Sequence, residues 1–218
     1  MAQSDTVLLV EGANDKHVIY ALCEHYKLPE TFTVDTPKES GATADGLPKL
    51  LEVFPIYLKG DKKAVGIVLD ADENMHQHWQ QVKRVIEQTG MGYVLPESPA
   101  PEGTIVEPTA VYQPRIGVWL MPDNHSVGRL EDFVRFLIPE GDELAPVAQE
   151  ILAQIKVSPG QRWPATHDSK AFIHTWLAWQ KSPGMPLGRT ITAKALHADS
   201  VLAHQFVDWL RRLFVLTV

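Results

Sequence analysis

The chain is short of several features that would assign it to a large class of proteins. Its 218 residues include one cysteine, Cys23, which excludes a disulfide framework and a cluster of thiolate metal ligands. No apolar run is long enough to cross a bilayer, and the apolar stretch near the N-terminus is strand-sized with no basic segment before it. We therefore expect a cytoplasmic protein without a membrane partner. Internal repeats and low-complexity tracts are also missing from the sequence.

Positive charge is scarce as well. The chain has 20 Lys and Arg residues against 27 Asp and Glu, a formal net charge of −7. This balance argues against a protein that coats nucleic acid through bulk charge. It does not exclude an enzyme that holds phosphates through metal ions and a local basic patch.

The order of apolar segments predicts an α/β fold. Expected strands are residues 5–10, 31–36, 64–69, 103–106 and 115–121, and expected helices between and after them are residues 15–26, 47–58, 73–90 and 128–138. Strands alternating with helices indicate a parallel sheet flanked by helices. After Pro139 the pattern is helical, over 142–156, 170–179 and 197–216. We expect an α/β domain at 1–140 and a helical extension at 141–218 packed on it.

Residues 64–74, AVGIVLDADEN, are the centre of this pattern. A strand buried on both faces ends abruptly at Asp70 and Asp72, whose side chains point the same way if the chain stays extended. Two carboxylates held so close repel one another unless a cation lies between them, and Mg²⁺ or Mn²⁺ prefers such oxygen ligands. The alternative is a solvated turn in which Asp72 or Asn74 caps the next helix.

Two further strand ends carry acids. Glu11 follows the first strand and Asp15 opens the helix after it, while Asp123 follows the strand at 115–121, with Glu131 and Asp132 a little beyond. In an open parallel sheet, ligands bind beyond the carboxyl ends of the strands. We expect these acids to meet Asp70 and Asp72 at that edge.

The sequence resembles the Toprim domain, which topoisomerases, primases and several nucleases share. The resemblance is carried by LLVEGANDKHVI (8–19), where a first strand ends in Glu-Gly, and by GIVLDADEN (66–74), where a third ends in Asp-x-Asp. Asp15, four residues after the Glu, is similar to an acid of the overcoming-lysogenization-defect nucleases. The blocks WLMPDNHSVGRLEDFV (119–134) and DSKAFIHTWLAWQ (168–180) look like a small stand-alone Toprim-like family of uncharacterised function.

The resemblance implies roles for particular residues. Glu11 matches a general base or metal ligand, and Asp70 with Asp72 matches the metal-binding pair. Acids that hold a second metal are matched by Asp15 and by Glu131, for which Asp132 is an equally good choice. Lys170 is the candidate for a basic residue near the scissile phosphate.

The leading hypothesis is a Mg²⁺- or Mn²⁺-dependent nuclease, with DNA favoured over RNA, working in repair or anti-phage defence. Two cations about 4 Å apart can activate water, relieve charge on the phosphate and assist the leaving oxygen. One alternative is a primase-like nucleotidyltransferase, although no P-loop is present. Another is a non-catalytic Toprim-like module that regulates a partner ATPase. The oligomeric state is left open.

Other polar and aromatic residues have two interpretations. His76 and His78, two apart on an expected helix, are interpreted as solvated, whereas His125 can reach the site from beside Asp123. The loop 40–46 is either a phosphate cradle or a plain connection. Tryptophans of the helical part are interpreted as core more readily than as base-stacking platforms, and its arginines as a solvated helix face.

Overall fold

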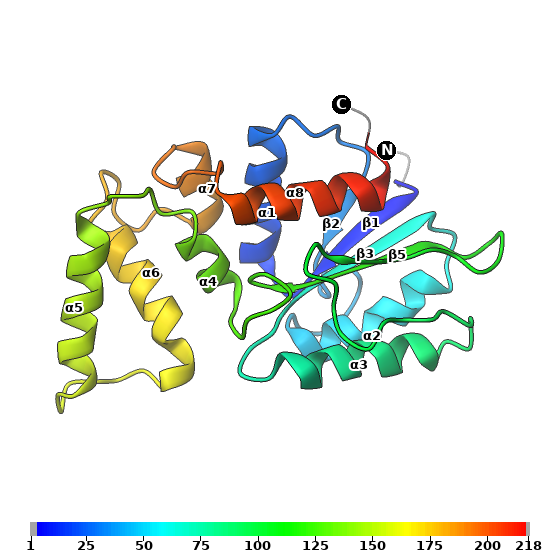
Figure 1. The fold of residues 1–218 in the computed structure, drawn as a ribbon, viewed down its shortest axis with the longest axis horizontal. Helices are drawn as coiled ribbons and strands as arrows, with labels where there is room; N and C mark the ends of the chain where they lie inside the picture. The colour runs from blue at the N-terminus through cyan, green and yellow to red at the C-terminus, as the bar shows by residue number, and fades with distance from the viewer. Residues whose placement is uncertain (1–3, 217–218) are drawn as a thin grey trace.

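The computed structural model describes residues 4–216, which form a five-stranded sheet flanked by helices, as expected for an α/β fold (Figure 1). The strand order is β2-β1-β3-β5-β4. The strands are β1 (Thr6–Val10), β2 (Thr33–Asp35), β3 (Ala64–Asp70), β4 (Thr104–Val106) and β5 (Arg115–Met121). Four of them run parallel, and the short edge strand β4 pairs antiparallel with β5, so the sheet is mixed rather than wholly parallel.

The helices follow the expected order, α2 with the expected bounds and the others with shifted ends. They are α1 (Ala13–His25), α2 (Leu47–Leu58), α3 (Met75–Glu87), α4 (Leu130–Arg135), α5 (Leu144–Lys156), α6 (Asp168–Ala178), α7 (Leu187–Thr192) and α8 (Val201–Phe214), with a 3₁₀ turn at Ala165–His167. The short helix α7 was not expected, and α4 spans only six residues. The predicted start of α1 at Asp15 was wrong, because the helix begins at Ala13 and Gly12 is its N-cap. No helix in the described part of the chain has the length and apolar character needed to cross a membrane.

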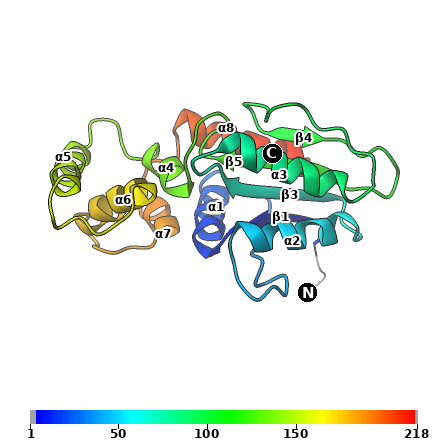
Figure 2. The ribbon, with the colours of Figure 1, turned by 90° about the horizontal axis from the view of Figure 1, so that it is seen from below.

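Alternate residues of the strands belong to two separate hydrophobic cores, one on each face of the sheet. Val7 and Leu9 of β1 face α2 and α3, whereas Leu8 and Val10 face the opposite core, to which α1 and α8 contribute. The view from below shows these layers, with α2 and α3 on one face of the sheet and α8 on the other (Figure 2). Because β1, β3 and β5 are covered on both faces, their sequences are almost continuously apolar.

Helix α8 packs closely on the sheet, and two glycines allow this. Gly66 of β3 and Gly117 of β5 are register partners, and a Cβ added to either would lie 2.8 Å or less from a methyl carbon of Leu213. Gly66 would in addition meet Leu8 at 2.5 Å. The last helix of the chain is therefore part of the α/β layer, and the expected helical extension is divided between this face and a separate arm.

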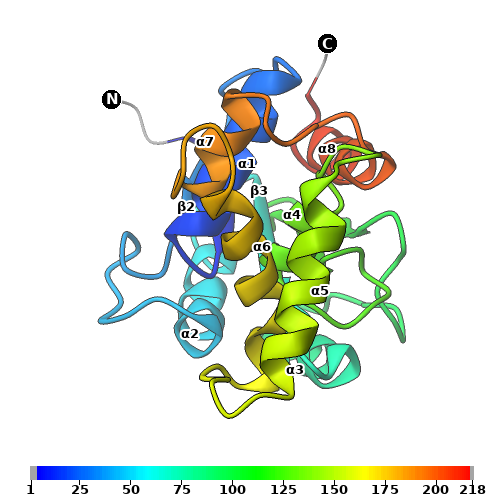
Figure 3. The ribbon, with the colours of Figure 1, turned by 90° about the vertical axis from the view of Figure 1, so that its left-hand side faces the viewer.

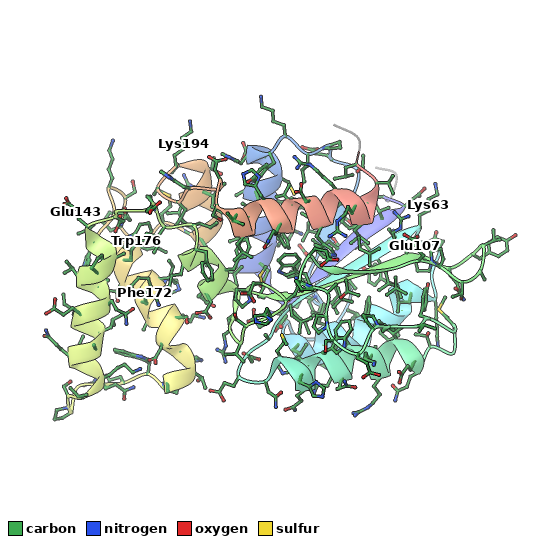
Figure 4. All side chains as sticks on the ribbon, in the orientation of Figure 1. Lys63, Glu107, Glu143, Phe172, Trp176 and Lys194 are labelled. Atoms are coloured by element: carbon green, nitrogen blue, oxygen red, sulfur yellow. The ribbon has the colours of Figure 1, made fainter. Side chains whose placement is uncertain are left out.

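The arm consists of α5 and α6 and projects from the end of the sheet where β1 and β3 finish (Figures 1 and 3). We call residues 144–178 the helical arm. Phe172 and Trp176 of α6 lie between its two helices, at the opposite end of the molecule from Lys63 and Glu107 (Figure 4). Trp176 and, in α8, Trp209 are fully buried, which confirms the core interpretation for these two tryptophans.

Candidate functional site

The parallel pairing of β1 with β3 brings two of the expected acids together. Val10 pairs with Val68, so Glu11 leaves β1 beside the last residues of β3. The backbone N–H of Asp70 donates a hydrogen bond to Oε1 of Glu11 over 2.8 Å. Two residues that are 59 positions apart in sequence are thereby fixed in direct contact.

Helices α1 and α4 add one acid each. Asp15 lies in the first turn of α1 and is 8% exposed, close to Gly12 at the helix N-cap. Glu131 lies in the first turn of α4 and is 7% exposed. The N–H of Leu130 donates to Oδ1 of Asp70 over 2.9 Å, which fixes the start of α4 against the end of β3.

These side chains line one pocket of about 360 Å³. The acidic residues in its wall are Glu11, Asp15, Asp70 and Glu131, and the basic residues are Arg129 and Lys170. The uncharged residues of the wall are Gly12, Ala13, Asn14, Gly46 and Leu130. Lys170 comes from α6 of the helical arm, and its Nζ lies 3.7 Å from Oε1 of Glu131. The arm thus contributes a positive charge to a pocket whose acids come from the sheet edge.

The acids of this pocket repel one another. Burial raises the pKa of Asp15 to about 7, and the charges of Glu11 and Glu131 add to the rise. Burial also holds the pKa of Asp70 well above its ordinary value, with further contributions from Glu11 and Asp15. The pKa of Glu11 is raised by burial and by the charge of Asp72, against the N–H of Asp70, which lowers it. These carboxyl groups have too little positive charge around them.

Asp72 does not line the pocket but lies at its rim. It has a left-handed backbone (φ 49°), and its N–H and C=O bond the backbone of Gly128 over 2.8 and 2.9 Å. This two-residue bridge brings Arg129 beside it, so that Nε of Arg129 lies 2.6 Å from Oδ1 of Asp72. The expected pair of Asp70 and Asp72 is therefore divided between the pocket and an ion pair.

His78 belongs to this neighbourhood, and the interpretation of His78 as solvated was wrong. Its side chain is 12% exposed, with Nδ1 2.8 Å from the carbonyl oxygen of Asp70 and Nε2 4.0 Å from Oδ2 of Asp72. The first turn of α3, whose N-cap is Asn74, directs it there. His76 is exposed, as expected.

Two of the expected metal ligands point elsewhere. The carboxylate of Asp123 accepts hydrogen bonds from the N–H groups of His125 and Ser126 and from Oγ of Ser126, so it stabilises its own turn. Asp132 accepts from the N–H of Arg129 and from Oγ of Ser169. The pocket wall includes none of Asp123, His125 and Asp132. Of the two adjacent acids in α4, Glu131 is the one that faces it.

The remaining alternatives are also placed by the structure. The loop 40–46 contributes only Gly46 to the pocket wall, through a hydrogen bond from its N–H to the carbonyl oxygen of Glu11 over 2.9 Å. Arg211 pairs with Asp208, and Arg212 donates to the carbonyl oxygen of Glu102. Neither arginine reaches the pocket.

The carboxylate oxygens of this pocket are the type of ligand that a hard divalent cation prefers. Within residues 4–216 no three His, Cys, Asp or Glu side chains are close enough to hold an ion by themselves. Mg²⁺ is commonly bound by one or two carboxylates, with waters and phosphate oxygens completing its shell. Carboxyl groups whose pKa values are raised by burial and by mutual repulsion fit that requirement, because a bound cation would relieve the repulsion.

The fold and this pocket define an α/β protein with clustered acids where the parallel strands end. The chain belongs to the family described as protein of unknown function DUF3226, whose model matches residues 5–215. No curated protein and no solved structure matches the chain. The match covers the α/β layer and the helical arm together.

Proposed function

We propose that the protein is a divalent-metal-dependent enzyme that hydrolyses phosphodiester bonds of nucleic acid, with Mg²⁺ or Mn²⁺ as its cofactor and DNA as the favoured substrate. The observation that carries the proposal is the convergence of Glu11, Asp15, Asp70 and Glu131 in one pocket with Lys170 at its edge. The likeness to Toprim nucleases in the Glu-Gly and Asp-x-Asp motifs supports the same chemistry.

Each group in the pocket has a role in this proposal. Glu11, Asp15, Asp70 and Glu131 would hold the cations, which when bound supply charge relief on the phosphate and an activated water. Lys170 is half exposed, so its ammonium group can meet a phosphate oxygen that enters from solvent. The first turn of α1 adds backbone N–H groups at the positive end of a 13-residue helix. The acids thus keep an anionic substrate out until cations are present.

Nicking of supercoiled plasmid DNA with Mg²⁺ or Mn²⁺ tests the proposal. We expect Asp70→Asn to reduce the rate about a thousandfold or more, because it removes a carboxylate ligand from the pocket wall. An Asn side chain can still accept the hydrogen bond from Leu130, so the fold should survive. The matched control is Asp123→Asn, an acid at the same sheet edge that bonds its own turn.

Activity that is unchanged by Asp70→Asn would contradict the assignment. Calorimetry that detects no Mg²⁺ or Mn²⁺ binding would favour a non-catalytic module serving a partner ATPase. Labelled nucleotides added to a primed template would reveal the nucleotidyltransferase alternative.

A further inference from the structure

The imidazole of His78 is held by one nitrogen and leaves the other directed at the site. Its Nδ1 lies 2.8 Å from the carbonyl oxygen of Asp70. A carbonyl oxygen can only accept, so Nδ1 carries the hydrogen and donates it. In a neutral ring, Nε2 then has a free lone pair. Histidines that bind metals are commonly fixed in this manner, by a hydrogen bond from the nitrogen that does not bind the ion.

The carboxylate that faces His78 is held in a similar way. Oδ1 of Asp72 lies 2.6 Å from Nε of Arg129, while Oδ2 lies 4.0 Å from Nε2 of His78. Each side chain therefore uses one atom for a protein contact and turns its second atom toward the other. The gap of 4.0 Å is too long for a hydrogen bond between them.

That gap of 4.0 Å is close to the distance between two opposite ligands of one metal ion. At bond lengths of about 2.1 Å, two donor atoms on one ion are about 3.0 Å apart when adjacent and about 4.2 Å apart when opposite. Glu11 lies within electrostatic range of both Asp72 and His78, and Arg129 is the cation paired with Asp72 on its other side. Since the described residues contain no group of three suitable side chains, water or substrate oxygens would complete the shell.

We propose that Nε2 of His78 and Oδ2 of Asp72 form a mixed nitrogen and oxygen position for a divalent transition-metal ion, which makes the site prefer Mn²⁺ to Mg²⁺. Imidazole nitrogen binds transition-metal ions readily, whereas Mg²⁺ demands oxygen. Arg129 is the positioning residue that fixes the carboxylate. The inference rests on the proposed function, because it adds a metal position at the rim of that pocket and names the nitrogen that would bind there.

Mn²⁺ is the probe, and electron paramagnetic resonance measures both affinity and ligand identity. The signal of unbound Mn²⁺ gives the dissociation constant, and electron spin echo envelope modulation detects a directly bound ¹⁴N nucleus. The variant is His78→Asn, because the Asn amide can keep the donor that Nδ1 provides while removing Nε2. The matched control is His76→Asn, an exposed histidine of the same helix turn. Circular dichroism establishes that both variants fold.

We expect ¹⁴N modulation in the wild type and in His76→Asn, and none in His78→Asn. The dissociation constant of His78→Asn for Mn²⁺ should rise about tenfold or more, with that for Mg²⁺ changing less than about threefold. Mn²⁺ bound to the wild type without ¹⁴N modulation would overturn the inference yet leave the proposed function standing, as would modulation that persists in His78→Asn. Absence of Mn²⁺ binding in every protein would overturn both.

Discussion

The carboxyl groups of the sheet edge and those of the helical arm have opposite electrostatic surroundings. At the sheet edge, burial and neighbouring acids raise the pKa values of Asp15 and Asp70. In the arm, Asp168 accepts hydrogen bonds from Lys156 and Trp163, and these contacts lower its pKa. One region leaves acids without enough counter-charge, and the other pairs its acid in the ordinary way.

This difference indicates where the chain loses folding stability in order to keep a functional site. Buried carboxylates that repel each other destabilise the folded state and persist where function requires them. An exposed pair such as Lys156 with Asp168 contributes about 1 kcal/mol or less. The arm therefore needs no functional explanation for its own acid, and Lys170 is the group by which it takes part in the pocket.

The largest expected difference between the two regions is in the pH dependence of the free energy of unfolding, measured with a chelator present. Asp15 has a folded pKa of about 7 against 3.8 for the ordinary group, so the folded state keeps a proton that the unfolded chain releases. Stability from this group is highest below pH 3.8 and falls until about pH 7. We expect Asp15→Asn to stabilise the protein at pH 8, by on the order of 2–4 kcal/mol, and to change little at pH 4.

Asp168→Asn is the matched control in the arm. The pKa of Asp168 is lowered, so its small contribution is present at neutral pH and is lost as the pH falls below the ordinary value of 3.8. The two substitutions should therefore differ in sign at pH 8 in urea unfolding. Equal effects would break the distinction between the two regions.

A smaller effect is expected from adding one methyl group to each region. Gly66→Ala places a Cβ 2.5 Å from Leu8 and 2.8 Å from Leu213, so the layer must shift, at a cost of about 1–3 kcal/mol. In the arm, Gly160→Ala meets nothing closer than Oγ of Ser158 at 3.4 Å and should be close to neutral. Thermal unfolding of both variants measures the difference. A destabilising Gly160→Ala would show that the arm is packed as tightly as the sheet.

The smallest effect is expected from removing the charge of Lys170, which the helical arm contributes to the pocket. Lys170→Met keeps the apolar stem and removes the ammonium group, and we expect DNA cleavage to slow about tenfold without a change in melting temperature. Lys181→Met, an exposed lysine just after α6, is the control and should cleave like the wild type. Equal rates for all three proteins would remove Lys170 from the site.

The sequence was sufficient for β1, β3 and β5, because these strands are buried on both faces and end abruptly. The strand at 115–121 matches β5 in full, and the convergence of Glu11 with Asp70 follows from parallel pairing. The phase of α4 was not accessible, so Glu131 and Asp132 could not be told apart. His78 was missed because its position depends on a tertiary contact with a carbonyl oxygen, which no residue pattern encodes.

The packing of α8 on Gly66 and Gly117 has a consequence for the chain during its synthesis. Over Gly66, Gly117 and Trp119, the cover of this face of the sheet comes from residues 201–214, beside α1. While the ribosome still holds that segment, the nascent sheet has an open apolar side that chaperones can recognise. Cutting the gene near codon 140 would make that vulnerable state permanent, so we expect the truncated product to aggregate when it is expressed alone.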